Sequence, residues 1–172
     1  MLSKPSGNSV GTTMRRMVVD ASVALKWFLK DELEDDVDLA NEVLFDALSG
    51  NLQLHVPDIF FHEVDGGLTR ACLTRTHRGS PPRMNIQSAL DALETLAAYP
   101  IQIHTPTLAH RQEVLNMAVH YAKGNYDMIY LHLAEQLNCQ WCMADERFLL
   151  SVRPGFPRHH VLLLSSLRVE AT

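Results

Sequence analysis

The chain has 172 residues, of which 47% are hydrophobic and 20% charged, and a domain of this length buries about 70% of the surface that its unfolded chain exposes. This composition is too apolar for intrinsic disorder, and no apolar run approaches the ~18 residues of a membrane-spanning helix. Fifteen Lys and Arg residues against twenty Asp and Glu residues give a net charge of −5, which excludes a protein that binds nucleic acid by overall electrostatic attraction alone.

The first sixteen residues are polar and lack the apolar segment of a secretory signal. We expect residues 1–16 to form a flexible tail and residues 17–172 to form a single domain. The cysteines are three in number, Cys72, Cys139 and Cys142, and an odd number argues against a disulfide framework and fits a reducing compartment. The sequence therefore predicts a cytoplasmic protein without membrane association.

Five short apolar segments predict β-strands. Residues 17–19 form a continuous apolar run, which is typical of a strand buried on both faces. Residues 52–56 and 101–103 alternate apolar and polar side chains, and residues 139–143 and 161–164 are short apolar runs.

Between these strands, apolar residues recur at helical spacing in segments 25–29, 37–48, 59–72, 88–98, 105–122 and 125–137. Asp58 is placed to cap the third of these helices, and the Thr105-Pro106 pair is placed to open the fifth. Gly66 and Gly67 each lower helix propensity by about 1 kcal/mol relative to alanine, which indicates close packing there. Alternating strands and helices predict a three-layer α/β/α sandwich with a mostly parallel central sheet.

Four carboxylates draw attention because an open parallel sheet binds ligands beyond the carboxyl ends of its strands. Asp20 and Asp145 follow predicted buried strands, Glu63 lies among apolar residues at the start of a helix, and Asp127 lies in the first helical turn of another. Each alone has a structural explanation as a helix cap, a dipole partner or half of an ion pair. Gathered together they would repel one another unless a cation neutralised them, and carboxylate oxygens suit Mg²⁺ or Mn²⁺.

Four segments in order resemble one known family. They are VVDASVALKWF at 18–28, VPDIFFHEVDGGL at 56–68, YDMIYLHLAEQLNC at 126–139 and MADERFL at 143–149. Over residues 17–165 the chain resembles PIN-domain ribonucleases, specifically the VapC-type toxins of type II toxin-antitoxin systems. The resemblance implies a PIN-like fold.

In that family, four acids at these motif positions surround a metal. The resemblance thus assigns metal binding and catalysis to Asp20, Glu63, Asp127 and Asp145, and a supporting role to Ser22, whose alternative role is a helix cap. It implies Mg²⁺-dependent hydrolysis of RNA phosphodiester bonds, with Mn²⁺ as a second metal option, to 5′-phosphate and 3′-hydroxyl products. It also implies an antitoxin partner and a homodimer, and it leaves open whether one or two ions bind.

Two positions depart from the family pattern. Met143 stands where the family often has Thr, and Gly66 where it often has Asn. Both family side chains would support the acidic site. A catalytically impaired PIN-like module that acts through protein or RNA contacts is therefore the alternative. A Mg²⁺-dependent phosphatase or phosphoacceptor domain is less consistent, because the DASVA segment at 20–24 has no second carboxylate two residues after Asp20.

Four arginines, Arg70, Arg75, Arg78 and Arg83, group around one helix end and the loop after it. They could guide the RNA backbone, although surface solubility explains them equally well.

Segments 39–48 and 89–98 are the amphipathic helices to consider for antitoxin or homodimer contacts, and core burial explains their apolar faces first.

The CQWC segment at 139–142 invites a redox or zinc interpretation. Residues three apart on a strand point to opposite faces, and no second ligand pair completes a zinc site. We therefore expect both sulfurs to be packed in the core.

Overall fold

The computed structural model describes residues 14–30, 34–73 and 81–169. The centre of the molecule is a five-stranded sheet in the order β3-β2-β1-β4-β5. Each neighbouring pair is parallel, so the predicted mostly parallel sheet is confirmed and is wholly parallel across the described residues. The strands are β1 (Arg15–Val19), β2 (Leu52–Pro57), β3 (Ile101–His104), β4 (Gln140–Met143) and β5 (Val161–Leu163).

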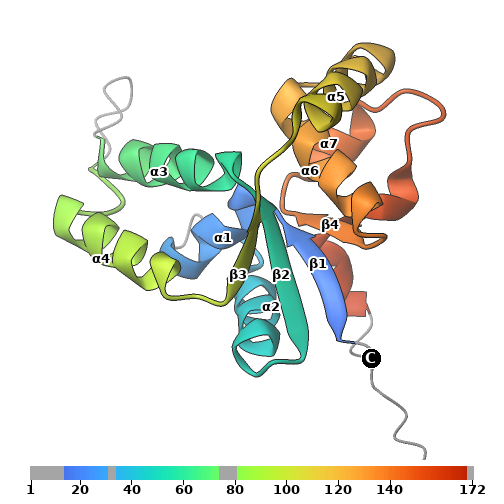
Figure 1. The fold of residues 1–172 in the computed structure, drawn as a ribbon. Helices are drawn as coiled ribbons and strands as arrows, with labels where there is room; N and C mark the ends of the chain where they lie inside the picture. The colour runs from blue at the N-terminus through green and yellow to red at the C-terminus, as the bar shows by residue number, and fades with distance from the viewer. Residues whose placement is uncertain (1–13, 31–33, 74–80, 170–172) are drawn as a thin grey trace, which may run out of the picture.

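Helices cover both faces of the sheet, which completes the predicted three layers. Figure 1 shows α1 to α4 on one side and α5 to α7 on the other. The helices are α1 (Ala21–Phe28), α2 (Val37–Leu48), α3 (Ile59–Cys72), α4 (Ile86–Ala97), α5 (Leu108–Tyr121), α6 (Asn125–Gln136) and α7 (Glu146–Leu150), with short 3₁₀ helices η1 (Arg158–His160) and η2 (Leu164–Val169). No described helix combines the length and apolarity needed to cross a membrane.

Several element boundaries differ from the predicted ones. The predicted tail comprised residues 1–16. Its residues 1–13 lie outside the described part of the chain, and its residues 15–16 belong to β1, which begins at Arg15. Asp58 makes no side-chain capping bond, so that prediction is wrong. The fifth helix begins at Leu108 rather than at the Thr105-Pro106 pair, because Thr107 and His110 form a capping box there.

The hydrophobic core lies on both sides of the central strand. Val18 and Val19 are fully buried, which explains the continuous apolar run of β1. Cys142 is buried and burial raises the pKa of its thiol to about 12, as expected for a packed and unreactive sulfur. Cys139, by contrast, is only half-buried.

The two adjacent glycines of α3 play different roles. A Cβ atom at Gly67 would lie 2.4 Å from Leu25 Cδ1, whereas one at Gly66 would meet only Arg70 Nη1, at 3.4 Å. Gly67 is therefore the residue that lets α3 pack closely against α1, which confirms the close packing predicted for this pair.

We expect Gly66→Ala to increase the free energy of unfolding by about 1 kcal/mol through helix propensity. Gly67→Ala gains the same propensity, but overpacking against Leu25 costs about 1–3 kcal/mol. Urea denaturation of the two variants measures the difference. Equal stability of both would contradict the proposed close approach.

Two histidines meet on neighbouring strands. His55 Nδ1 of β2 lies 2.9 Å from His104 Nε2 of β3. Burial, with smaller contributions from His104 and Arg16, lowers the pKa of His55 to about 4, and burial also lowers the pKa of His104. The folded protein therefore holds His55 neutral at neutral pH.

This pair predicts a pH dependence of stability. Between pH 6.5 and about 4 the unfolded chain binds a proton at His55 that the folded protein does not, so the free energy of unfolding falls as the pH falls through this window. The contribution is on the order of 2–3 kcal/mol. Chemical denaturation at several pH values should show a smaller decrease in His55→Gln than in the wild type, and an unchanged decrease would disprove the assignment.

Candidate active site

Two of the predicted carboxylates follow adjacent parallel strands. Asp20 comes directly after β1, and its backbone N–H donates to the carbonyl of Cys142 on β4 at 2.9 Å. Its Oδ1 accepts from the backbone N–H of Ser22 at 2.8 Å. Asp145 follows β4 and its Oδ1 accepts from the backbone N–H of Arg147 at 3.0 Å. Both aspartates thus cap the helices that follow them, and parallel strand pairing places both at one edge of the sheet.

The other two carboxylates come from helices. Glu63 lies on α3 and Asp127 lies in the first turn of α6, and both are half-buried while Asp145 is exposed. Burial raises the pKa values of Asp20, Glu63 and Asp127. Their mutual repulsion adds to this effect, since Asp20 and Asp127 raise the pKa of Glu63, and Asp20 and Asp145 raise the pKa of Asp127. The fold therefore brings the four predicted acids into one electrostatic cluster.

The chemistry of this cluster fits a hard cation. Its donors are carboxylate oxygens whose raised pKa values report negative charge that the protein leaves poorly neutralised. Lys123 lowers the pKa of Asp127, but its ammonium group also donates to Ser151 Oγ and to the carbonyl of Phe148. Across the described residues no three His, Cys, Asp or Glu side chains stand in a ready metal-ligating arrangement.

A buried aromatic pair contacts two of the acids. The indole Nε1–H of Trp141 donates to Asp20 Oδ2 at 3.0 Å, and the hydroxyl of Tyr130 donates to Glu63 Oε2 at 2.6 Å. The two rings stack with centroids 5.8 Å apart and planes 11° apart. Each acid keeps further lone pairs for another partner, so this pair fixes the carboxylates without exhausting them.

Sequence analysis missed the polar roles of these rings. Trp141 is core, as its apolar strand suggests, but a buried indole N–H needs an acceptor. Tyr130 lies three residues after Asp127 on α6, a spacing that puts both on one side of the helix. These two signals were present in the sequence, although neither identifies the acid contacted.

Ser22 supports the same edge of the sheet. Its Oγ accepts from the backbone N–H of Ala144 at 3.0 Å, so it ties the start of α1 to the segment that carries Asp145. The departures from the family pattern have different surroundings. Met143 is 3% exposed and belongs to the core, whereas Gly66 lies beside the guanidinium of Arg70.

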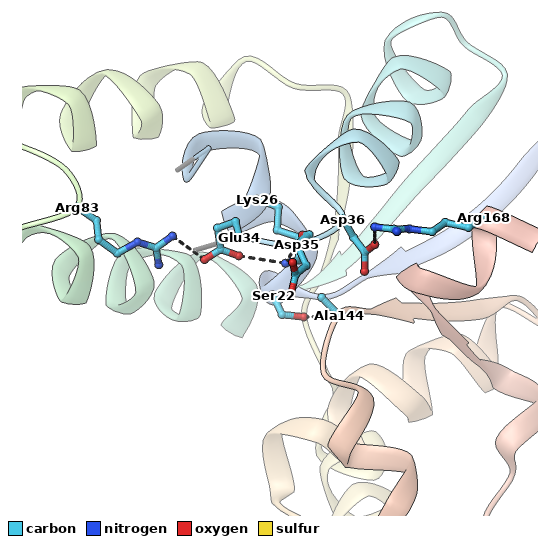
Figure 2. A network of polar contacts seen from close by, with 8 residues as sticks. All are labelled: Ser22, Lys26, Glu34, Asp35, Asp36, Arg83, Ala144 and Arg168. Carbon is cyan, nitrogen blue, oxygen red and sulfur yellow. Dashed lines mark hydrogen bonds and ion pairs between the residues drawn. The ribbon is translucent and has the colours of Figure 1, made fainter. Parts of the chain in front are cut away.

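A groove of about 550 Å³ opens beside Asp145. Asp145, Ser22 and Ala144 line it together with Arg70 and Arg83. Two of the four arginines predicted to guide RNA are therefore brought to the acidic edge, while Arg75 and Arg78 lie outside the described residues. Figure 2 shows that Arg83 points toward Glu34, a residue that the sequence did not single out.

The chain belongs to the PIN-domain family, whose sequence model matches residues 17–150. This confirms the resemblance inferred from the four motifs. No curated protein sequence matches the chain.

Solved structures with the same fold include proteins of toxin-antitoxin systems. A chain of a toxin-antitoxin complex from Klebsiella pneumoniae aligns with a TM-score of 0.56 at 13% identity, covering 86% of this chain and 97% of that one. VapC20 of Mycobacterium tuberculosis, a toxin that cleaves the sarcin-ricin loop, gives 0.56 at 11% identity, covering 78% and 93%. PAE2754 from Pyrobaculum aerophilum gives 0.57 at 16% identity, covering 94% and 100%. At these identities the similarity shows the fold alone.

The sequence resemblance assigns metal binding to Glu63, so we expect Tyr130→Phe to weaken binding of Mn²⁺ by about 10-fold or more, because loss of a hydrogen bond to such a carboxylate typically costs that much. Isothermal titration calorimetry measures the affinity directly. Tyr99→Phe is the matched control, since Tyr99 packs against Trp27 and Phe28 instead. Equal Mn²⁺ affinities of the two variants would show that Tyr130 does not position Glu63.

Proposed function

We propose that this protein is a metal-dependent endoribonuclease and the toxin of a toxin-antitoxin pair. The observation that carries the proposal is the cluster of Asp20, Glu63, Asp127 and Asp145 at one edge of a PIN-domain sheet, where burial and, to a smaller extent, neighbouring carboxylates raise the pKa values of Asp20, Glu63 and Asp127. PIN domains are nucleases that use divalent metal ions, and the family therefore gives these acids a joint task.

In this proposal the four carboxylates hold Mg²⁺, or Mn²⁺ in its place. A divalent cation at such a site supplies Lewis acidity toward the phosphate and an activated water for in-line attack. The stacked pair of Trp141 and Tyr130 keeps two of the carboxylates in fixed orientations, which limits the reorganisation needed as charge develops. The products carry a 5′-phosphate and a 3′-hydroxyl.

The substrate reaches the acids through the groove beside Asp145. Arg70 and Arg83 line this groove, which supports contacts of both with phosphates of the RNA backbone; Arg75 and Arg78 join them from their positions in the sequence alone. Such contacts position the strand without reading its sequence. We propose the four arginines as RNA-guiding residues on this basis.

The partners follow from the similar structures. Toxin-antitoxin complexes are among them, which supports an antitoxin that pairs with this protein. We further propose a cytoplasmic homodimer whose residues 17–172 form one nuclease domain. Segments 39–48 and 89–98, which correspond to α2 and to α4 with its C-cap residue, remain the surfaces proposed for antitoxin or homodimer contacts. Phe45 and Leu48 of α2 and Ile86 and Leu90 of α4 are exposed.

We expect Asp20→Asn to reduce RNA cleavage by about 100-fold or more, because it removes a charged ligand from the metal site. The variant should stay folded, since the amide oxygen can still cap α1 and loss of the buried charge offsets loss of the hydrogen bond from Trp141. Asp65→Asn, an exposed acid on the helix of Glu63, is the matched control. The measurement is cleavage of a mixed RNA panel with Mg²⁺, Mn²⁺ or EDTA, alongside thermal melts.

Two outcomes would contradict this function. Full activity of Asp20→Asn would show that Asp20 is not needed for cleavage. Cleavage unaffected by EDTA would show that the metal is not needed. A wild-type protein that binds RNA or a partner but cleaves nothing with either metal would support the impaired binding module instead. Met143 and Gly66 are the positions that favour this second function, because neither supplies the polar group that the family often has.

A further inference from the structure

The groove beside the acidic cluster contains one carboxylate held between two cations. Lys26 Nζ of α1 lies 3.0 Å from Glu34 Oε2, and Arg83 Nη2 lies 2.8 Å from Glu34 Oε1. All three side chains line the groove, and Figure 2 shows Glu34 between the two cations. Each oxygen of one carboxylate therefore has its own cation.

These ion pairs are not ordinary surface salt bridges. The side chains of Lys26, Arg83 and Glu34 are only 11%, 17% and 19% exposed. Ion pairs shielded to this degree are screened less by salt than exposed ones. The two cations lie at a groove beside the candidate site for phosphodiester cleavage. The Glu34 carboxylate that they bind resembles a phosphate of the RNA, because guanidinium groups bind carboxylates and phosphates with the same geometry.

We propose that Lys26 and Arg83 form a binding site for a backbone phosphate of the RNA, and that Glu34 occupies this site until RNA displaces it. The inference rests on the function proposed above. A phosphodiester offers two non-bridging oxygens, one for each cation, in place of the two oxygens of Glu34. The net charge of −5 makes such a local cationic site necessary, because the molecule as a whole repels RNA.

Two contacts beside Glu34 do not depend on its side chain. Lys26 Nζ also donates to the carbonyl of Asp35 at 2.8 Å, so the ammonium group keeps an anchor at the groove wall. Asp36 pairs with Arg168 of η2, which holds the start of α2 in place. Departure of Glu34 is then a change of side-chain rotamer, and its cost lowers the affinity for RNA.

The test is RNA affinity in the absence of cleavage. Fluorescence anisotropy with a labelled single-stranded RNA of about ten nucleotides, in EDTA and at several salt concentrations, gives the affinity and its salt dependence. We expect Glu34→Gln to bind about two- to fivefold tighter than the wild type. The slope of log K against log salt should stay similar, because RNA makes the same phosphate contact in both proteins once Glu34 has left the site.

Glu42→Gln is the matched control, because it makes the same change in net charge at an exposed position of α2 that does not line the groove. Arg83→Gln or Lys26→Gln, added to Glu34→Gln, should reverse the gain in affinity. If Glu34→Gln does not fold, Glu34→Asp replaces it: the shorter side chain cannot reach both cations and should give a smaller gain.

Affinity of Glu34→Gln no higher than that of Glu42→Gln would overturn the inference, as would a gain that survives removal of Arg83. Because the measurement needs no metal, its failure is separable from failure of the proposed nuclease. Cleavage of RNA by the wild type without any gain in Glu34→Gln overturns only the phosphate site. A gain in Glu34→Gln without cleavage by the wild type supports the phosphate site and overturns the nuclease.

Discussion

Repulsion among four carboxylates at one edge of the sheet is the constraint on which the rest of the structure depends. The acids come from four separate segments: Asp20 follows β1, Glu63 lies on α3, Asp127 begins α6 and Asp145 follows β4. Placing them there costs free energy, because burial, with a smaller contribution from their mutual repulsion, raises the pKa values of the three more buried acids. A protein retains such a cluster when burial elsewhere stabilises the fold and the cluster has work to do.

The hydrophobic core carries much of that opposing stabilisation and also orients the acids. Trp141 is the largest of the fully buried side chains, and the same residue donates a hydrogen bond to Asp20. Tyr130 stacks on it and donates to Glu63. Core packing and site geometry are therefore not separable here: a substitution that loosens the aromatic pair also loosens the two carboxylates.

The sequence predicts the framework of this molecule better than its details. Periodicity and the order of elements predict the parallel sheet, because strands buried on both faces, such as β1 and β4, have continuous apolar sequences. The positions of Asp20 and Asp145 follow from that framework. The contact of Trp141 with Asp20, 121 residues away in sequence, could not be predicted, since side-chain orientation at the end of a strand depends on packing. The Thr105-Pro106 prediction failed because Thr107, two residues further on, caps the helix. Asp58 does precede α3, but its side chain makes no capping bond. The metal and RNA-guiding roles of the predicted residues stay predictions.

The net negative charge of the chain says less about RNA binding than the local charges of the groove do. A net charge of −5 excludes affinity for RNA that depends on the whole surface, yet the groove beside Asp145 holds Lys26, Arg70 and Arg83. Glu34 neutralises two of these cations by direct ion pairs, so the free protein offers little attraction even there. Under the proposed function, RNA affinity at this groove depends on release of Glu34, and neutralisation of the carboxylate cluster by a cation adds to it. A nuclease of this kind would bind polyanions weakly in general and engage a strand at this groove, which limits indiscriminate binding without a sequence-reading surface.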